Sequence, residues 1–246
     1  MTATPSTTST PTVVLVHGAF ADASSWSGVI TELQAAGLEV VAPPNLLRGI
    51  DVDSAYLTSY VDQLSSPVLL VGHSYGGALI TQTGTDARNV VGLVFVSAFA
   101  PDTNEKLGDI NTRYPDVPLS SALRTITYPN DGAAAGTEAY IDYTAFPDVF
   151  CADLPLEQAR VMAVAQRPIS LNAFTTVVTG TPAWKNVPSW AVHGTADHAI
   201  HPDAERDMAK RAGTQIVEID GGSHAVAVSQ AKTVAGVILT AVKATN

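Results

Sequence analysis

The sequence is short of cysteine, of basic residues and of long apolar runs, and each shortage excludes a class of protein. The single cysteine, Cys151, excludes an internal disulfide and any zinc or iron–sulfur site built on several cysteines. Because 13 Lys and Arg stand against 23 Asp and Glu, the formal net charge of −10 leaves no positive surplus to neutralise phosphates. We therefore expect neither nucleic acid nor an anionic membrane surface as a partner. No apolar run reaches the ~18 residues that a transmembrane helix needs.

The N-terminal end does not resemble an export signal. Residues 1–11 are small and polar, no basic residue occurs before Arg48, and no apolar segment comes first. A secretory signal peptide needs a basic start followed by an apolar segment. We therefore expect residues 1–11 to be a disordered tail and the protein to be cytoplasmic.

The remaining sequence is typical of a folded α/β protein. With 246 residues, of which 46% are hydrophobic and 15% charged, the chain can bury a sizeable core. Short apolar runs rich in β-branched residues predict buried strands at 12–17, 38–42, 67–72, 90–98, 189–193 and 214–219. Capping and stop signals predict helices between them at 24–36, 53–64, 75–87, 202–212 and 224–242. This alternation indicates a mostly parallel sheet with helices on both faces.

The alternation stops between residues 101 and 187. This stretch is rich in proline and aromatic residues, and only 156–166 and 170–179 show a helical pattern. We therefore predict that 12–100 and 188–246 form the α/β core. The stretch 101–187 is expected to be an insertion over the edge of the sheet rather than an independent domain.

The segment GHSYGG at 72–77 carries the clearest sign of chemistry. It follows a buried apolar run and precedes an expected helix, so Ser74 falls at a sharp turn where glycines on either side avoid clashes. The helix N-terminus directs free N–H groups and the positive end of its dipole toward Ser74. A Gly-x-Ser-x-Gly pattern in this setting is typical of a nucleophilic serine.

A serine hydroxyl becomes a strong nucleophile only when a neighbouring base takes its proton, and histidine has a suitable pKa. His224 follows the last predicted strand and so belongs to the same carboxyl edge of the sheet as Ser74. Asp197 follows the preceding strand and can hold the imidazole in one tautomer, with Asp102 as the alternative acid. We predict the catalytic triad Ser74, Asp197 and His224, in the chain order given for this class of hydrolase.

Two backbone N–H groups are expected to stabilise the oxyanion that forms when a serine attacks a carbonyl. The first is that of Tyr75, directly after the nucleophile. The second comes from HGAF at 17–20, after the first strand, where Gly18 allows a tight turn and Ala19 is the favoured donor. No metal is needed for this chemistry, and none is expected.

These segments resemble the α/β-hydrolase superfamily. HGAFADASSW, GHSYGG, GTADHAI and SHAVAVSQ are similar to its small esterase-like members, which are related to the plant methylesterases and hydroxynitrile lyases and to the bacterial esterase/perhydrolase group. The resemblance implies about six parallel strands, because the chain begins too close to its first strand for the family's first two. It also implies that 101–187 is a cap, or lid, and that esters are cleaved through an acyl-enzyme on Ser74 without a cofactor. The family's hydroxynitrile lyases carry Lys after the catalytic His, whereas Ala225 follows His224 here.

We therefore expect an esterase-like serine hydrolase whose partner is a small-molecule ester or lactone. Phe20 and Tyr75 flank the expected oxyanion site and, with the aromatic residues of 101–187, favour an apolar or aromatic substrate pocket. Two alternatives stay open. One is a C–C hydrolase, perhydrolase or lyase that uses the same triad, and the other is a non-enzymatic ligand-binding protein of the same fold.

Overall fold

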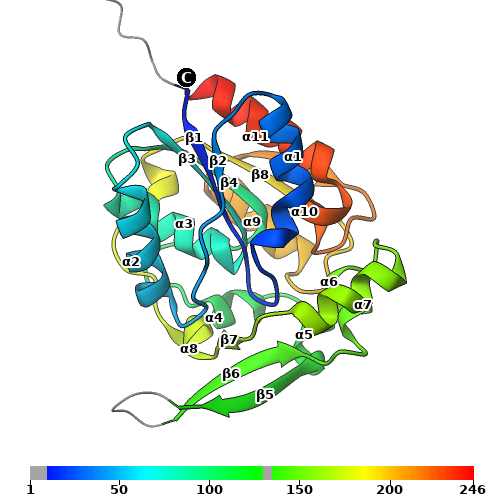
Figure 1. Cartoon of the computed structure of the whole chain (residues 1–246). Coiled ribbons are helices and arrows are strands. Elements are labelled where there is room, and N and C mark those ends of the chain that lie inside the picture. Colours follow the sequence, from blue (N-terminus) through cyan, green and yellow to red (C-terminus); the bar gives the residue numbers. More distant parts are fainter. Residues whose placement is uncertain (1–9, 130–134) are drawn as a thin grey trace, which may run out of the picture.

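The core of the protein is one parallel β-sheet (Figure 1). The computed structural model describes residues 10–129 and 135–246. Six strands pair in the order β2-β1-β3-β4-β8-β9, and all neighbours in this sheet are parallel. They are β1 (Thr12–Val16), β2 (Val40–Val41), β3 (Val68–Ser74), β4 (Val90–Ala98), β8 (Ser189–Gly194) and β9 (Gln215–Ile219). The predicted fold class, with six strands in the predicted stretches, is confirmed.

The strand order reverses beside β1. From β1 the chain moves to β2 at one edge, and it then returns to β3 on the other side of β1 before continuing outward to β9. In open α/β sheets, ligands bind outside the carboxyl ends of the strands where the order reverses. The loop that follows β1 and the turn at Ser74 both begin at this point.

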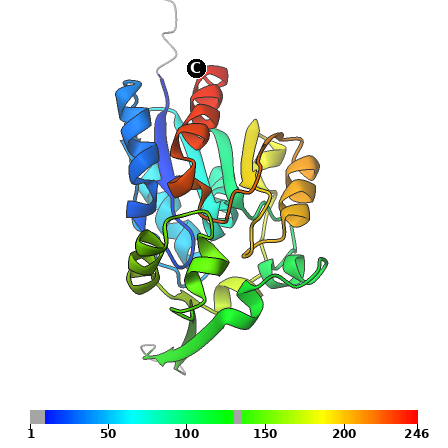
Figure 2. The same ribbon diagram turned by 90° about the vertical axis from the view of Figure 1, so that its right-hand side faces the viewer.

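Helices cover both faces of the sheet (Figure 2). Successive strand residues point to opposite faces, so Val13 and Leu15 pack on one side and Val14 and Val16 on the other. The first side is covered by α1 (Ser27–Ala35) and α11 (Ala231–Ala244). The second is covered by α2 (Ile50–Val61), α3 (Tyr75–Asp86) and α9 (Pro202–Arg211).

The ends of some helices differ from the prediction. A short 3-10 helix, η1 (Ala23–Trp26), precedes α1. Helix α2 begins earlier than predicted because Asp53 folds back and accepts hydrogen bonds from the N–H groups of Arg48 and Gly49. The helix predicted at 224–242 is divided into α10 (Val226–Ser229) and α11, since Gln230 leaves the helical conformation with φ −126°.

The stretch between β4 and β8 forms a second layer at the carboxyl end of the core sheet (Figure 1). Three strands pair antiparallel in it: β5 (Leu123–Tyr128), β6 (Gly136–Ile141) and β7 (Ile169–Ser170). The helices are α4 (Leu107–Asn111), α5 (Leu119–Ala122), α6 (Phe146–Phe150), α7 (Leu156–Ala165), α8 (Asn172–Thr175) and η2 (Ala183–Lys185). The helix predicted at 156–166 is present as α7, whereas that predicted at 170–179 is wrong beyond the single turn of α8.

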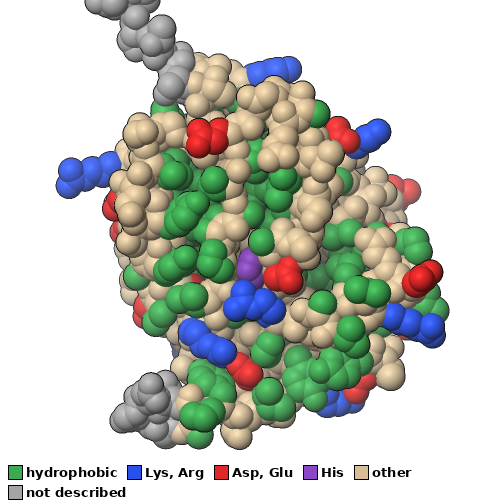
Figure 3. All heavy atoms as spheres, viewed as in Figure 1, with side chains coloured by type: hydrophobic (Ala, Val, Ile, Leu, Met, Phe, Trp, Pro, Cys, Tyr) green, Lys and Arg blue, Asp and Glu red, His purple; other side chains and the backbone are tan. Residues whose placement is uncertain are grey.

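Three further predictions concern the surface charge, membrane-spanning helices and the N-terminal tail. On the face shown in Figure 3, Lys and Arg side chains lie at separate places among acidic and apolar ones. None of the helices in the described residues is both long enough and apolar enough to cross a bilayer. The tail predicted at 1–11 falls mostly outside the described part of the chain.

The central strand β3 provides a test of the core. Leu70 is fully buried in β3, whereas Leu156 is 53% exposed at the start of α7. Leu70→Ala should lower the free energy of unfolding by about 2–5 kcal/mol, because it removes buried apolar surface and leaves a cavity. The same change at Leu156 should cost no more than about 0.5 kcal/mol. Urea denaturation followed by circular dichroism measures both, and equal losses would contradict the burial of β3.

Candidate active site

Ser74 stands at a strained turn between β3 and α3. Its φ of 54° and ψ of −121° lie outside the conformations that L-residues ordinarily adopt. The surrounding glycines are required by close packing. A Cβ on Gly72 would lie 2.5 Å from the carbonyl oxygen of Gly76, and a Cβ on Gly76 would lie 2.5 Å from that of Val16. The strand–turn–helix setting predicted for GHSYGG is therefore present.

His224 and Asp197 meet in a buried hydrogen bond. The Nδ1 atom of His224 lies 2.6 Å from Oδ2 of Asp197, and both side chains are at most 1% exposed. The other carboxylate oxygen accepts the N–H groups of Ala199, at 2.7 Å, and Ile200, at 2.9 Å. Because a carboxylate oxygen accepts hydrogen bonds, Nδ1 of His224 is the donor to Oδ2 and carries a proton. The alternative acid, Asp102, instead pairs with Lys185 at 2.5 Å.

Ser74 and His224 line the same cavity, of about 20 Å³, at the carboxyl edge of the sheet. Among the hydrogen bonds of the described residues, none joins the Ser74 hydroxyl to His224. The side chains that line this cavity with them are mostly apolar: Ala19, Phe20, Tyr75, Phe99, Leu119, Phe174, Ala199 and Ile200, with Asn111 as the polar exception. The structure thus joins His224 to Asp197 by a hydrogen bond and places Ser74 at the same cavity as His224.

The residues predicted to supply the oxyanion site also reach this cavity. Tyr75 is the first residue of α3, where a backbone N–H has no partner within the helix. The loop that carries Ala19 packs directly on Ser74, since a Cβ on Gly18 would lie 2.6 Å from Cβ of Ser74. The N–H of Phe20 is already used, because it donates to the carbonyl of Arg167 at 3.0 Å. This leaves Ala19 as the candidate on this loop.

His73 has a structural contact that the sequence did not indicate. Its Nε2 donates to the backbone carbonyl of His224 at 3.0 Å, and the two rings are 4.7 Å apart. Burial, and next the charge of His224, hold the pKa of His73 well below its ordinary value, so its ring is neutral. The residue before Ser74 therefore links the loop of His224 to β3.

Two further side chains have contacts that the sequence did not indicate. Asp53, in the first turn of α2, accepts the hydroxyl of Tyr75 at 2.7 Å, and burial raises the pKa of this carboxyl group. Asn111, at the end of α4, lines the cavity of Ser74, and its amide oxygen is buried without a hydrogen-bond partner among the described residues. No sequence pattern marks Asn111, because its place depends on how 101–187 folds over the sheet.

The chain is similar to known hydrolases and to a lyase. The profile of the alpha/beta hydrolase family matches residues 13–237. Methylesterase 8 of Arabidopsis thaliana is 29% identical over 231 residues, covering 86% of this chain and 82% of that protein. The alpha-hydroxynitrile lyase of the same plant is 27% identical over 241 residues, covering 88% and 91%. The crystal structure of polyneuridine aldehyde esterase superposes with a TM-score of 0.80 at 21% identity, covering 95% of this chain and 99% of that one.

The crowding around Ser74 predicts opposite effects for the same substitution at two helical glycines. Gly76→Ala should lower the free energy of unfolding by about 1–3 kcal/mol, because its methyl group would overlap the Val16 carbonyl. Gly236→Ala, in α11 with nothing near its Cβ position, should raise it by about 0.5–1 kcal/mol. Chemical denaturation of the two variants checks this, and a stabilised Gly76→Ala would contradict the tight turn.

Proposed function

The chain belongs to the alpha/beta hydrolase family, and from this premise we propose that it is an esterase-type serine hydrolase that cleaves small carboxylic esters with Ser74, His224 and Asp197. The observation that carries the proposal is the buried 2.6 Å hydrogen bond between His224 and Asp197 at the cavity of Ser74. The similarity to Methylesterase 8 supports an ester as the substrate.

The mechanism begins with the proton of Ser74. Because Nδ1 of His224 donates to Asp197, Nε2 is unprotonated and can act as the base. As Oγ of Ser74 bonds to the ester carbonyl carbon, its proton passes to Nε2 and the imidazolium is stabilised by the carboxylate. Hydrogen bonds of this kind often shorten only when substrate binds, so the missing Ser74–His224 bond is compatible with this role.

The second half of the reaction uses the same groups. The N–H groups of Ala19 and Tyr75 stabilise the oxyanion of the tetrahedral intermediate. When the intermediate collapses, His224 gives its proton to the leaving alcohol and an acyl group stays on Ser74. His224 then takes a proton from water, which attacks the acyl carbon and releases the acid. A lactone would open by the same steps.

The cavity indicates what kind of ester fits. Phe20 and the apolar side chains around it favour a small apolar substrate, and the aromatic ring of Tyr75 is held in place through its hydroxyl on Asp53. Asn111 adds one polar group, whose buried oxygen can accept a hydrogen bond from a hydroxyl or N–H of the substrate. A lyase activity has one observation in its favour, the similarity to the alpha-hydroxynitrile lyase.

Replacement of the nucleophile tests the proposal. Ser74→Ala should reduce ester hydrolysis to the background rate while the unfolding midpoint stays within a few degrees of the wild type, because only one hydroxyl is lost. A fluorophosphonate probe should label the wild type and not the variant. Ser59→Ala, at an exposed position of α2, is the matched control and should keep full activity. Hydrolysis that survives in Ser74→Ala would overturn the proposal.

The role of Asn111 can be tested with two esters that differ only by a hydroxyl group on the acyl chain. The wild type should prefer the hydroxylated ester, because the plain ester leaves the buried amide oxygen unpaired. Asn111→Leu, of similar size, should reduce that preference in kcat/KM by roughly tenfold. Steady-state kinetics with both esters give the ratio, and an unchanged preference in the variant would exclude this role.

A further inference from the structure

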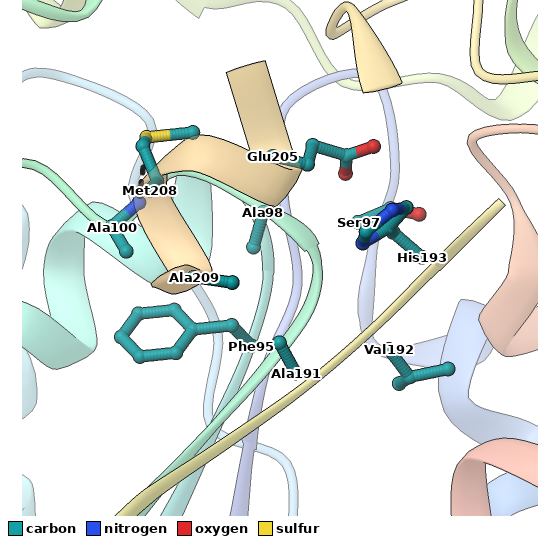
Figure 4. Close-up of a pocket in the computed structure, with 10 residues that line it drawn as sticks. All are labelled: Phe95, Ser97, Ala98, Ala100, Ala191, Val192, His193, Glu205, Met208 and Ala209. Atoms are coloured by element: carbon teal, nitrogen blue, oxygen red, sulfur yellow. Dashed lines mark hydrogen bonds between the residues drawn. The ribbon is translucent and has the colours of Figure 1, made fainter. Parts of the chain in front are cut away.

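A second, smaller cavity is lined by buried polar atoms that have no part in the proposed mechanism (Figure 4). Its volume is about 10 Å³, and it lies between the ends of β4 and β8 and helix α9. The polar side chains that line it are Ser97, His193 and Glu205, each at most 3% exposed. Four of their atoms have no hydrogen-bond partner among the described residues: Oγ of Ser97, Nε2 of His193 and both carboxyl oxygens of Glu205.

Both the size and the lining of this cavity fit one water molecule. A buried water needs a cavity of roughly 10–15 Å³ and two to four polar partners. Buried polar groups in folded proteins are nearly always paired, so four unpaired atoms around one cavity point to a shared partner.

Within the described part of the chain, no Lys, Arg or His side chain pairs with the carboxyl group of Glu205. Its neighbour Arg206 is directed elsewhere, since Nε donates to Glu218 at 2.6 Å and Nη1 donates to Asp203. Burial lowers the pKa of His193, although the carboxylate of Glu218, 3.6 Å from Nε2 of His193, opposes this shift in part. Burial, and next the negative charge of Asp197, raise the pKa of Glu205 well above its ordinary value, with Arg206 opposing only in part.

The hydrogen-bond partners decide which of the two neighbouring carboxyl groups carries the charge. Asp197 accepts three hydrogen bonds, from His224, Ala199 and Ile200, and these stabilise its anion. Glu205 accepts none from the described residues. Where two buried carboxyl groups are close, the one without donors keeps the proton.

We propose that the cavity lined by Ser97, His193 and Glu205 is a binding site for one water molecule. In this proposal Glu205 is a neutral carboxylic acid that donates a hydrogen bond to the water. The water site and the proton on Glu205 go beyond the proposed function and do not depend on it.

The pH dependence of stability tests the proton on Glu205. Above about pH 4.5, the ordinary pKa of a glutamate, an unfolded chain loses this proton while the folded protein keeps it. The wild type should therefore lose stability relative to Glu205→Gln as the pH rises. The ratio of their unfolding equilibrium constants should grow by up to tenfold per pH unit until Glu205 ionises in the folded protein.

Matched variants make this result decisive. Glu157→Gln makes the same change at an exposed position of α7, and its ratio to the wild type should not change with pH. Glu205→Met should show the same slope as Glu205→Gln and replaces it if the glutamine variant does not fold. A pH-independent ratio for the Glu205 variants would overturn the neutral carboxylic acid, and this measurement needs no substrate.

Activity and crystallography test the remaining parts. If Glu205 were ionised, Glu205→Gln would remove a negative charge and shift the acid limb of kcat/KM to lower pH. The expected limb coincides with that of the wild type, and a shift to lower pH would overturn the proposal. A crystal structure should show a water within hydrogen-bond distance of at least two of Ser97, His193 and Glu205. A dry cavity in ordered density would overturn the water site.

Discussion

Backbone segments at the ends of two neighbouring strands crowd against the turn of Ser74, and this crowding determines where the other groups of the site can lie. The carbonyl of Val16 blocks a side chain at Gly76, and the carbonyl of Phe99 blocks one at Gly77. Because neither segment can move away without opening the sheet, the ends of β1, β3 and β4 are fixed relative to one another. The strained φ of Ser74 persists because its surroundings permit no relaxation.

The same close backbone packing occurs at the loops that carry Asp197 and His224. A Cβ on Gly194, at the end of β8, would collide with the backbone carbonyl of Gly222, just before His224. The loops of Asp197 and His224 therefore pack backbone to backbone, and the hydrogen bond of His73 to the carbonyl of His224 adds a link to β3. The loops of the site are thus held together by close main-chain packing and by one side-chain hydrogen bond from His73.

The sequence was sufficient for features that are local or depend on chain order. GHSYGG at 72–77 has its meaning within one strand–turn–helix unit, and the fold class follows from apolar runs that alternate with helices. Features that depend on contacts between distant segments could not be predicted from the sequence. The strand β5 shows mostly exposed residues and so lacks the alternation that reveals a strand, and the partner of Asp53 is a tyrosine from another helix.

The loop after β8 both donates hydrogen bonds to Asp197 and lines the cavity of Ser74. Ala199 and Ile200 donate their N–H groups to Asp197, and both residues also line the cavity of Ser74. Three other lining residues, Asn111, Leu119 and Phe174, come from the stretch between β4 and β8, and among the described residues none of them forms a hydrogen bond with Ser74, Asp197 or His224. A substitution at Ala199 or Ile200 that moves its backbone N–H can therefore disturb the hydrogen bonds of Asp197. Substitutions in the overlying stretch can alter the shape of the cavity and leave the hydrogen bond between Asp197 and His224 intact.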